Sequence, residues 1–139
     1  MTDVCKVILV GESGVGKTCI IIRFINNEYY EEAPSTTGAS FATQTFEFEE
    51  YNKKLQYDIW DTAGQEKYRG LAKIFYKNAA IAILVYDITN RKSFEEIKNY
   101  WYEQIKNNGS PNISKIILFK YFCFLMKYME LQEIRLTNI

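Results

Sequence analysis

The sequence predicts an α/β fold built on a mainly parallel sheet with one antiparallel hairpin. Short apolar runs, which are typical of strands buried on both faces, alternate along the chain with stretches of helical periodicity. Helices between such strands imply βαβ units, whose strands run parallel. A glycine-rich segment at 11–18 lies between the first apolar run and the first helical stretch. With 139 residues, 47% of them apolar, the chain can form one domain with a substantial core.

The first half of the chain predicts a strand, a helix and a hairpin. Residues 4–10 have few polar breaks and read as a buried strand, and residues 17–26 have a helical period. Residues 28–34 are polar and without a period, so we expect a loop. Residues 41–49 and 55–60 alternate apolar and polar side chains across a short polar turn, which predicts an antiparallel hairpin.

The second half predicts two further helices and two strands. We expect a helix over 68–77 and a strand over the apolar run 79–86. Ser93 followed by Glu96 has the spacing of a capping box, so we expect a helix to begin there and to end at Asn108. Its apolar face would carry Phe94, Ile97, Trp101 and Ile105. Residues 114–119 read as a last strand.

The segment from Lys120 onward has a different character. Its apolar residues fit a helical stripe formed by Phe122, Leu125, Met126 and Met129. A packing helix and a poorly ordered chain end both fit this pattern, and the sequence does not decide between them.

The overall charge gives no support for two classes of partner. Seventeen basic residues balance seventeen acidic ones, so nothing favours a nucleic-acid partner or an acidic membrane surface. The three cysteines, Cys5, Cys19 and Cys123, lack the spacing of a metal site, and the chain has no histidine. The first residues do not form a signal peptide, and 79–86 is too short to cross a bilayer. We therefore expect a reduced, cytoplasmic protein. We also expect a monomer.

The glycine-rich segment reads Gly-Glu-Ser-Gly-Val-Gly-Lys-Thr and has the strand–GxxxxGK[ST]–helix pattern of a phosphate-binding loop. Its glycines allow the backbone to wrap around a phosphate and to direct several N–H groups at one anion. Lys17 can reach the outer phosphates, and the Thr18 hydroxyl can hold Mg²⁺. The helix that follows turns its positive end to the same place. A glycine-rich turn without a ligand is the alternative interpretation, and the pattern favours a P-loop NTPase.

Two further segments carry chemistry that matches such a loop. Asp61 follows the strand 55–60, at the edge of the sheet where open α/β proteins bind ligands, and can hold Mg²⁺ through water. The Gly64 N–H can meet a terminal phosphate, and Gln65 can orient a water for attack. Asp61 could also be an ordinary strand cap. A hydroxyl from Ser35-Thr36-Thr37 could complete the Mg²⁺ shell, or this segment could be a simple turn.

Several motifs together resemble one known family. They are GESGVGKT (11–18), STTGASF (35–41), WDTAGQEKYRGLA (60–72), LVYDITNRKSF (84–94) and SPNI (110–113). The chain resembles Rab-type small GTPases of the Ras superfamily, and 38–45 with 110–113 is most similar to the early-endosomal Rabs. The resemblance runs from Asp3 to Leu118 without a gap. It implies a partial Ras-like G domain over 1–118 and a divergent tail over 119–139.

The resemblance implies binding of GTP or GDP with Mg²⁺, GTP hydrolysis, and a role as a switch in vesicle and endosomal traffic. It also implies effectors, an exchange factor and a GTPase-activating protein as partners. The residues on the nucleotide would be Ser13, Gly14, Val15, Gly16, Lys17, Thr18, Cys19, Tyr29, Ser35, Thr36 and Gly64. Mg²⁺ would be held by Thr18, Thr36 and Asp61, and Gln65 would be catalytic. Effectors would read the aromatic side chains Phe41, Trp60 and Phe75.

The chain departs from the family after Leu118. The guanine-reading Asn-Lys-x-Asp does not occur in the 139 residues, and neither do the later elements of the family or its C-terminal prenylation cysteines. From this we expect no membrane anchor of that kind, and an apolar sheet face beside the first helix that is bare or covered by the tail. Three functions therefore stay open: a GTP-hydrolysing switch, a binding module for effectors or exchange factors, and a fragment that does not fold stably. We expect Arg69 to be solvated or to contact partners.

Overall fold

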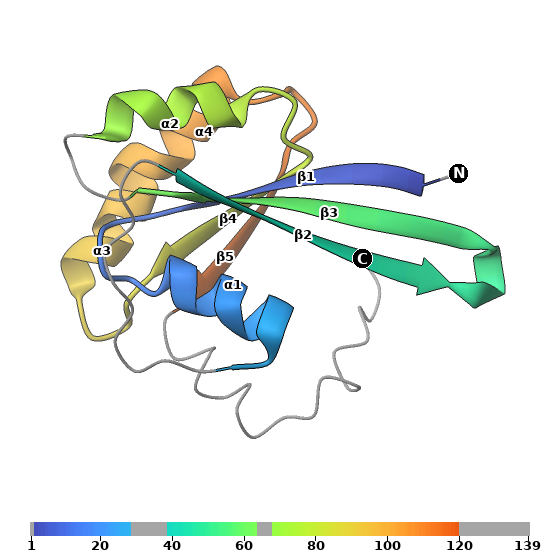
Figure 1. The fold of residues 1–139 in the computed structure, drawn as a ribbon. Helices are drawn as coiled ribbons and strands as arrows, with labels where there is room; N and C mark the ends of the chain where they lie inside the picture. Colours follow the sequence, from blue (N-terminus) through green and yellow to red (C-terminus); the bar gives the residue numbers. More distant parts are fainter. Residues whose placement is uncertain (1, 29–38, 64–67, 120–139) are drawn as a thin grey trace.

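A five-stranded sheet forms the centre of the molecule in the computed structural model, which describes residues 2–28, 39–63 and 68–119 (Figure 1). The strands are β1 (Thr2–Val10), β2 (Ala39–Phe48), β3 (Lys53–Thr62), β4 (Ile81–Tyr86) and β5 (Ser114–Phe119). Their order across the sheet is β2-β3-β1-β4-β5. Only β2 runs antiparallel to its neighbour, β3, whereas the other pairs are parallel. The predicted α/β fold with a mainly parallel sheet and one hairpin is confirmed.

Helices cover both faces of this sheet. Helix α1 (Lys17–Asn26) lies on one face, below the sheet in Figure 1, and α2 (Arg69–Tyr76) lies on the other. The face with α2 also carries α3 (Arg91–Glu96), the π-helical segment η3 (Ile97–Trp101) and α4 (Tyr102–Asn108). A short 3-10 turn, η1 (Glu49–Tyr51), joins β2 to β3. The bounds predicted for α1 and β5 match the structure, and β3 extends two residues further than predicted at each end.

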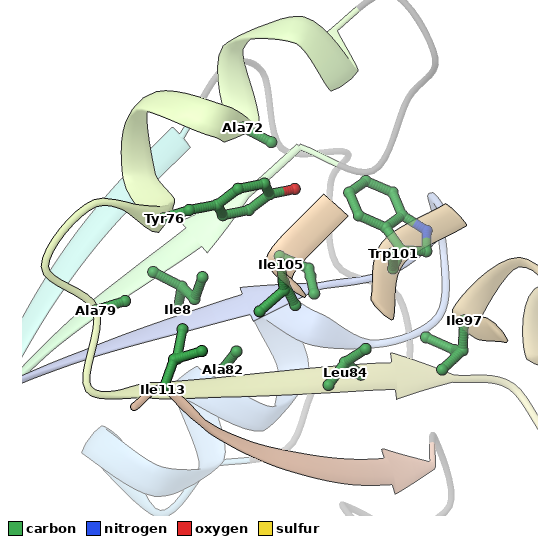
Figure 2. Close-up of a cluster of buried hydrophobic side chains, with 11 residues drawn as sticks. Ile8, Ala72, Tyr76, Ala79, Ala82, Leu84, Ile97, Trp101, Ile105 and Ile113 are labelled. Carbon is green, nitrogen blue, oxygen red and sulfur yellow. The ribbon is translucent and has the colours of Figure 1, made fainter. Parts of the chain in front are cut away.

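The strand β1 supplies both hydrophobic cores because its side chains alternate between the two faces. Ile8 and Val10 point to the side of α2 and α4, and Val7 and Leu9 point to the side of α1. On the first side, the fully buried rings of Tyr76 and Trp101 lie over the sheet (Figure 2). They pack there with Ile8, Val10, Ala72, Ala79, Ala82, Leu84, Ile97, Ile105 and Ile113.

The core on the side of α1 is built from fewer large side chains. Ile20 and Ile21 of α1 pack on Val7, Leu9, Val15, Ile59 and Val85. Toward β5 the sheet carries exposed apolar side chains, with 44% of Ile116 and 54% of Ile117 accessible. Ile117, aligned with Leu84, lies on the face of α2 and α4, whereas Ile116, aligned with Ile83, lies on the face beside α1. The sequence led us to expect that the face beside α1 is bare or covered by the tail. The tail that could cover it, including the stripe from Phe122 to Met129, lies outside the described residues.

Ser93 does not act as the predicted helix cap. Helix α3 begins at Arg91, with Asn90 in the N-cap position, so Ser93 lies within the first turn. The buried Ser93 hydroxyl donates to the carbonyl of Asn90 at 2.7 Å and accepts from the N–H of Asp87 at 2.9 Å. The capping-box prediction was therefore wrong, because the Ser93 hydroxyl is hydrogen-bonded to the turn at 87–90 and does not cap the helix.

The helical stretch that follows is predicted correctly in extent but not in regularity. Ile97, Trp101 and Ile105 are buried as predicted, while Phe94 is partly buried and packs on Tyr86 at 5.0 Å between ring centroids. The π-helical turn of η3 interrupts the α-helical register between α3 and α4. Across the described ranges, no helix is long and apolar enough to cross a membrane.

Candidate phosphate-binding site

The segment 11–16 leaves the end of β1 and enters α1, as its pattern predicted. Its three glycines have positive φ angles, 149° at Gly11, 76° at Gly14 and 95° at Gly16. A Cβ on Gly11 would lie 2.2 Å from the carbonyl oxygen of Val85, so no other residue fits there. Gly16 occupies the N-cap position of α1 in the left-handed region, which glycine adopts without the steric cost that a Cβ brings. The turn that the segment makes therefore depends on glycine at two positions for different reasons.

Lys17 is the buried cation of this loop. Its side chain is 5% exposed, and its Nζ donates to the carbonyl oxygens of Gly11 at 3.0 Å and Glu12 at 2.8 Å. Burial lowers the pKa of Lys17 to about 8, against the opposing effect of the Asp61 and Glu12 carboxylates. The lysine is thus desolvated at the centre of a turn rich in backbone N–H groups, where an anion would favour its charged form.

A hydroxyl and a carboxylate meet beside this loop. The Thr18 Oγ1 donates to Asp61 Oδ2 at 2.5 Å, although the two residues are 43 positions apart. Parallel pairing places them together, because Leu9 at the end of β1 is aligned with Asp61 of β3. The Thr62 hydroxyl donates to the carbonyl of Leu9 at 2.6 Å and ties the two strand ends. Two hard oxygen donors at one place fit a Mg²⁺ ion. In the described part of the chain, no three His, Cys, Asp or Glu side chains gather as a metal cluster.

The other loop residues divide between surface and core. Ser13 and Gly14 are exposed, whereas Val15 is 2% exposed and packs into the core beside α1. Cys19 is half-buried and packs against the same core. The remaining predicted site residues, Tyr29, Ser35, Thr36, Gly64 and Gln65, lie outside the described residues, and their roles stay predictions.

Three aromatic side chains form a row across β2, β3 and α2. Phe41 is aligned with Trp60 in the hairpin, with ring centroids 4.8 Å apart, and Trp60 contacts Phe75 at 5.1 Å. Phe41 is 52% exposed, and the other two are partly buried. The structure therefore brings together the three aromatics that the sequence singled out. The end of the row at Phe41 is exposed to solvent.

The structure also pairs Glu12 of the loop with Arg69, two charged residues that sequence reasoning missed or misread. Arg69 is not solvated: its side chain is 19% exposed, and its Nη2 donates to Glu12 Oε1 at 2.5 Å. Glu12 received no role from the sequence, because the second position of the loop pattern accepts any residue. An arginine 57 positions away offers no local sign of this pairing.

A mainly parallel α/β sheet with a glycine-rich loop around a buried lysine defines the fold of P-loop proteins. Comparison with protein families gives a match to the Ras family over residues 6–121. The chain belongs to the Ras family.

Individual relatives give a finer likeness. The chain is 44% identical over 113 residues to the Ras-related protein Rab-13 of Rattus norvegicus, and equally to those of Bos taurus and Canis lupus familiaris. Each match covers 81% of this chain and 54% of the relative, so the chain spans about half the length of these relatives. The predicted resemblance to Rab-type small GTPases is confirmed. The closer likeness to early-endosomal Rabs stays a prediction.

Proposed function

We propose that this chain binds GTP and GDP with Mg²⁺ and hydrolyses GTP, as a switch in vesicle or endosomal membrane traffic. The observation that carries the proposal is the turn around Lys17, in which the positive φ angles of the glycines wrap the backbone about a buried ammonium group. The names of the similar Rab-13 proteins and the family match support the same class of function.

The phosphates of the nucleotide would lie in the loop. Backbone N–H groups from Ser13 to Cys19 would donate to the phosphate oxygens, and the N-terminus of α1 would favour their negative charge. Lys17, now hydrogen-bonded to two loop carbonyls, would exchange these partners for phosphate oxygens. This exchange supplies a charged donor where the bare loop has only neutral ones.

Mg²⁺ would be held at the Thr18–Asp61 contact, with Thr36 as a further hydroxyl ligand and Asp61 acting through water. The bound ion would neutralise charge on the phosphates. The 2.5 Å contact between Thr18 Oγ1 and Asp61 Oδ2 supports this role, because a hydroxyl and a carboxylate share one place at the loop.

Hydrolysis would depend on positioning more than on covalent chemistry. Gly64 would sense the terminal phosphate, Gln65 would orient the attacking water, and a GTPase-activating protein would accelerate the reaction. Ser35 and Tyr29 would complete the nucleotide contacts, with Tyr29 covering the guanine edge. Effectors and an exchange factor would dock beside these segments, with effectors reading the row of Phe41, Trp60 and Phe75. We expect a monomer in the cytoplasm that acts at vesicle membranes.

One observation favours a second candidate function. Asn-Lys-x-Asp, through which the family reads guanine, does not occur in this sequence. Loss of its charge-assisted hydrogen bonds to the base removes on the order of 1.5–3 kcal/mol of preference for guanine. A chain that binds the phosphates but does not recognise the base would act mainly as a binding module for effectors or exchange factors.

Isothermal titration with GTP, GDP and ATP in the presence of Mg²⁺ tests the proposal. We expect micromolar or tighter binding of GTP to the wild type and loss of that binding in Lys17→Ala. The control is Lys53→Ala, which removes an exposed lysine at the start of β3, in the hairpin and far from the phosphate loop. Equal affinity for ATP and GTP would favour the binding module. Unchanged affinity in Lys17→Ala would rule out the proposed site.

A further inference from the structure

One guanidinium group, that of Arg69, joins the phosphate loop to the helices α2 and α3. Arg69 at the start of α2 donates from its Nη2 to Glu12 Oε1 at 2.5 Å and to Glu96 Oε2 at 3.1 Å. Glu12 belongs to the loop and Glu96 ends α3, so the contacts span 57 and 27 positions of the chain. A single side chain thus connects the loop with both helices that line this side of the site.

The π-helical segment η3 adds two aromatic side chains to the same group. The Tyr100 ring lies 4.2 Å from the Arg69 guanidinium, and Trp101 Nε1 donates to Glu12 Oε1 at 3.0 Å. The extra residue of a π turn shifts the helical register, and such turns are frequent at functional sites. We refer to Glu12, Arg69, Glu96, Tyr100 and Trp101 as the Arg69 network.

The charges of this network are largely shielded from solvent. The exposed fractions are 19% for Arg69, 21% for Glu12 and 24% for Glu96. Burial works against the Arg69 charge, but the carboxylates of Glu12 and Glu96 outweigh it, so the pKa of Arg69 is raised. Shielded pairs of this kind are screened less by salt than exposed ones, such as Arg91–Glu95, whose side chains are 86% and 53% exposed.

Glu12 links this network directly to the phosphate-binding lysine. Its carboxylate is held by Arg69 and Trp101, while its backbone carbonyl accepts from Lys17 Nζ at 2.8 Å. The contacts of the Glu12 side chain therefore hold the backbone of the loop in place at its second residue. A loop held in its binding shape before the ligand arrives loses less entropy on binding and releases the ligand more slowly.

We propose that Glu12 is a positioning residue that, through Arg69 and Trp101, holds the phosphate loop in its nucleotide-binding shape and sets the rate of nucleotide release. This inference rests on the proposed nucleotide binding and adds residues to which the loop pattern gives no role. The network contacts no phosphate in this scheme and acts only through the backbone of the loop.

Release of a fluorescent GDP analogue, chased with excess GDP, measures the effect. We expect Glu12→Gln and Arg69→Gln each to accelerate release roughly tenfold, as loss of one shielded charge-assisted contact would. The double variant should release no faster than either single variant, because both break the same contact. The matched control, Arg91→Gln with Glu95→Gln, removes an exposed pair on the same side of the fold and should release at the wild-type rate.

A spectroscopic readout separates positioning from a merely structural contribution. Trp101 and Trp60 are the two tryptophans of the chain, so a Trp60→Phe variant leaves one indole N–H resonance, that of Trp101. We expect this resonance to move when GDP–Mg²⁺ binds and to move again in Glu12→Gln. An indole resonance that ignores nucleotide would overturn the inference, as would additive effects of Glu12→Gln and Arg69→Gln on release.

Arg69→Lys keeps the positive charge and provides a second test if Arg69→Gln does not fold. We expect it to release nucleotide faster than the wild type, because an ammonium group lacks the planar fork that stacks on Tyr100. Wild-type release from a folded Arg69→Lys protein would contradict the inference. If wild-type protein binds nucleotide and every network variant behaves as the control, only this inference fails. If the wild type binds none, the proposed function fails and the inference with it.

Discussion

The ionisation of Lys17 predicts how nucleotide affinity depends on pH. The perturbation is a rise in pH from 7 to 9, across the pKa of about 8 that burial gives this side chain. A bound triphosphate stabilises the ammonium form, so binding above this pKa must take up a proton. A free protein that has lost this proton binds the phosphates poorly.

The size of the effect follows from the shift. Below pH 7 almost every free molecule carries the charged lysine, while at pH 9 roughly one in ten does, given a pKa of about 8. The dissociation constant should therefore rise about tenfold between pH 7 and pH 9, which corresponds to about 1.4 kcal/mol. Calorimetric titrations in two buffers of different ionisation enthalpy should show uptake of close to one proton at pH 9.

Two variants isolate the lysine from other groups. Lys17→Arg keeps a charge that does not titrate in this range, so its affinity should not change with pH whatever its absolute value. Cys19→Ser removes the nearest thiol of the loop and should keep the wild-type slope. An equal slope in Lys17→Arg and in the wild type would refute the reasoning, because another group would then be titrating.

The same shift predicts the opposite trend for stability without nucleotide. The folded pKa of about 8 lies below the ordinary value of 10.5, so between these pH values the unfolded chain binds more protons than the folded one. Unfolding free energy should then rise with pH through this window, after subtraction of the values for Lys17→Met. Denaturant titrations at several pH values give this difference, and a difference that falls with pH would have the wrong sign.

Further predictions concern glycine and a buried hydroxyl. Gly11→Ala should lower the melting temperature by several degrees or prevent folding, since its Cβ would lie 2.2 Å from the Val85 carbonyl oxygen. Gly70→Ala is the matched control: nothing lies within 4 Å of its Cβ, and an alanine within α2 should stabilise by about 0.5–1 kcal/mol. A Gly11→Ala melting temperature equal to that of the wild type would contradict the close approach. The Tyr76 hydroxyl is buried without a hydrogen-bond partner among the described residues, so Tyr76→Phe should be neutral or stabilising by about 1 kcal/mol in urea titrations. Clear destabilisation by Tyr76→Phe would show that the hydroxyl has a partner.

The elements that sequence patterns predicted well are those fixed by local periodicity. Alternation in the hairpin and the 3.6-residue period of α1 placed β2, β3 and α1 within a few residues of their observed bounds. The turn of the glycine-rich loop was predicted as well, because glycine adopts the positive φ angles at Gly14 and Gly16 most readily. The role of this loop toward phosphate stays a prediction. Each of these patterns is complete within about ten residues.

Two of the errors have a common physical cause, which is a side chain whose hydrogen-bond partner is not the one that its sequence spacing suggests. Ser93 has the spacing of a cap, but its hydroxyl is hydrogen-bonded to the backbone of Asp87 and Asn90. Arg69 looks like a surface residue until α2 packs near the loop and Glu12 becomes its neighbour. The π turn at η3 was not predicted either, since its residues fit an ordinary helix equally well.

The position of Val15 and Glu12 has a consequence for how mutations affect this protein. Val15 inserts into the core on one face of the sheet, and Glu12, three residues earlier, is bonded to Arg69 and Trp101 on the opposite face. The glycine-rich loop thus contacts both faces of the sheet, and its position depends on the packing of both. We expect a cavity made far away, beneath either α1 or α4, to weaken the proposed nucleotide binding without altering any residue proposed to contact the nucleotide.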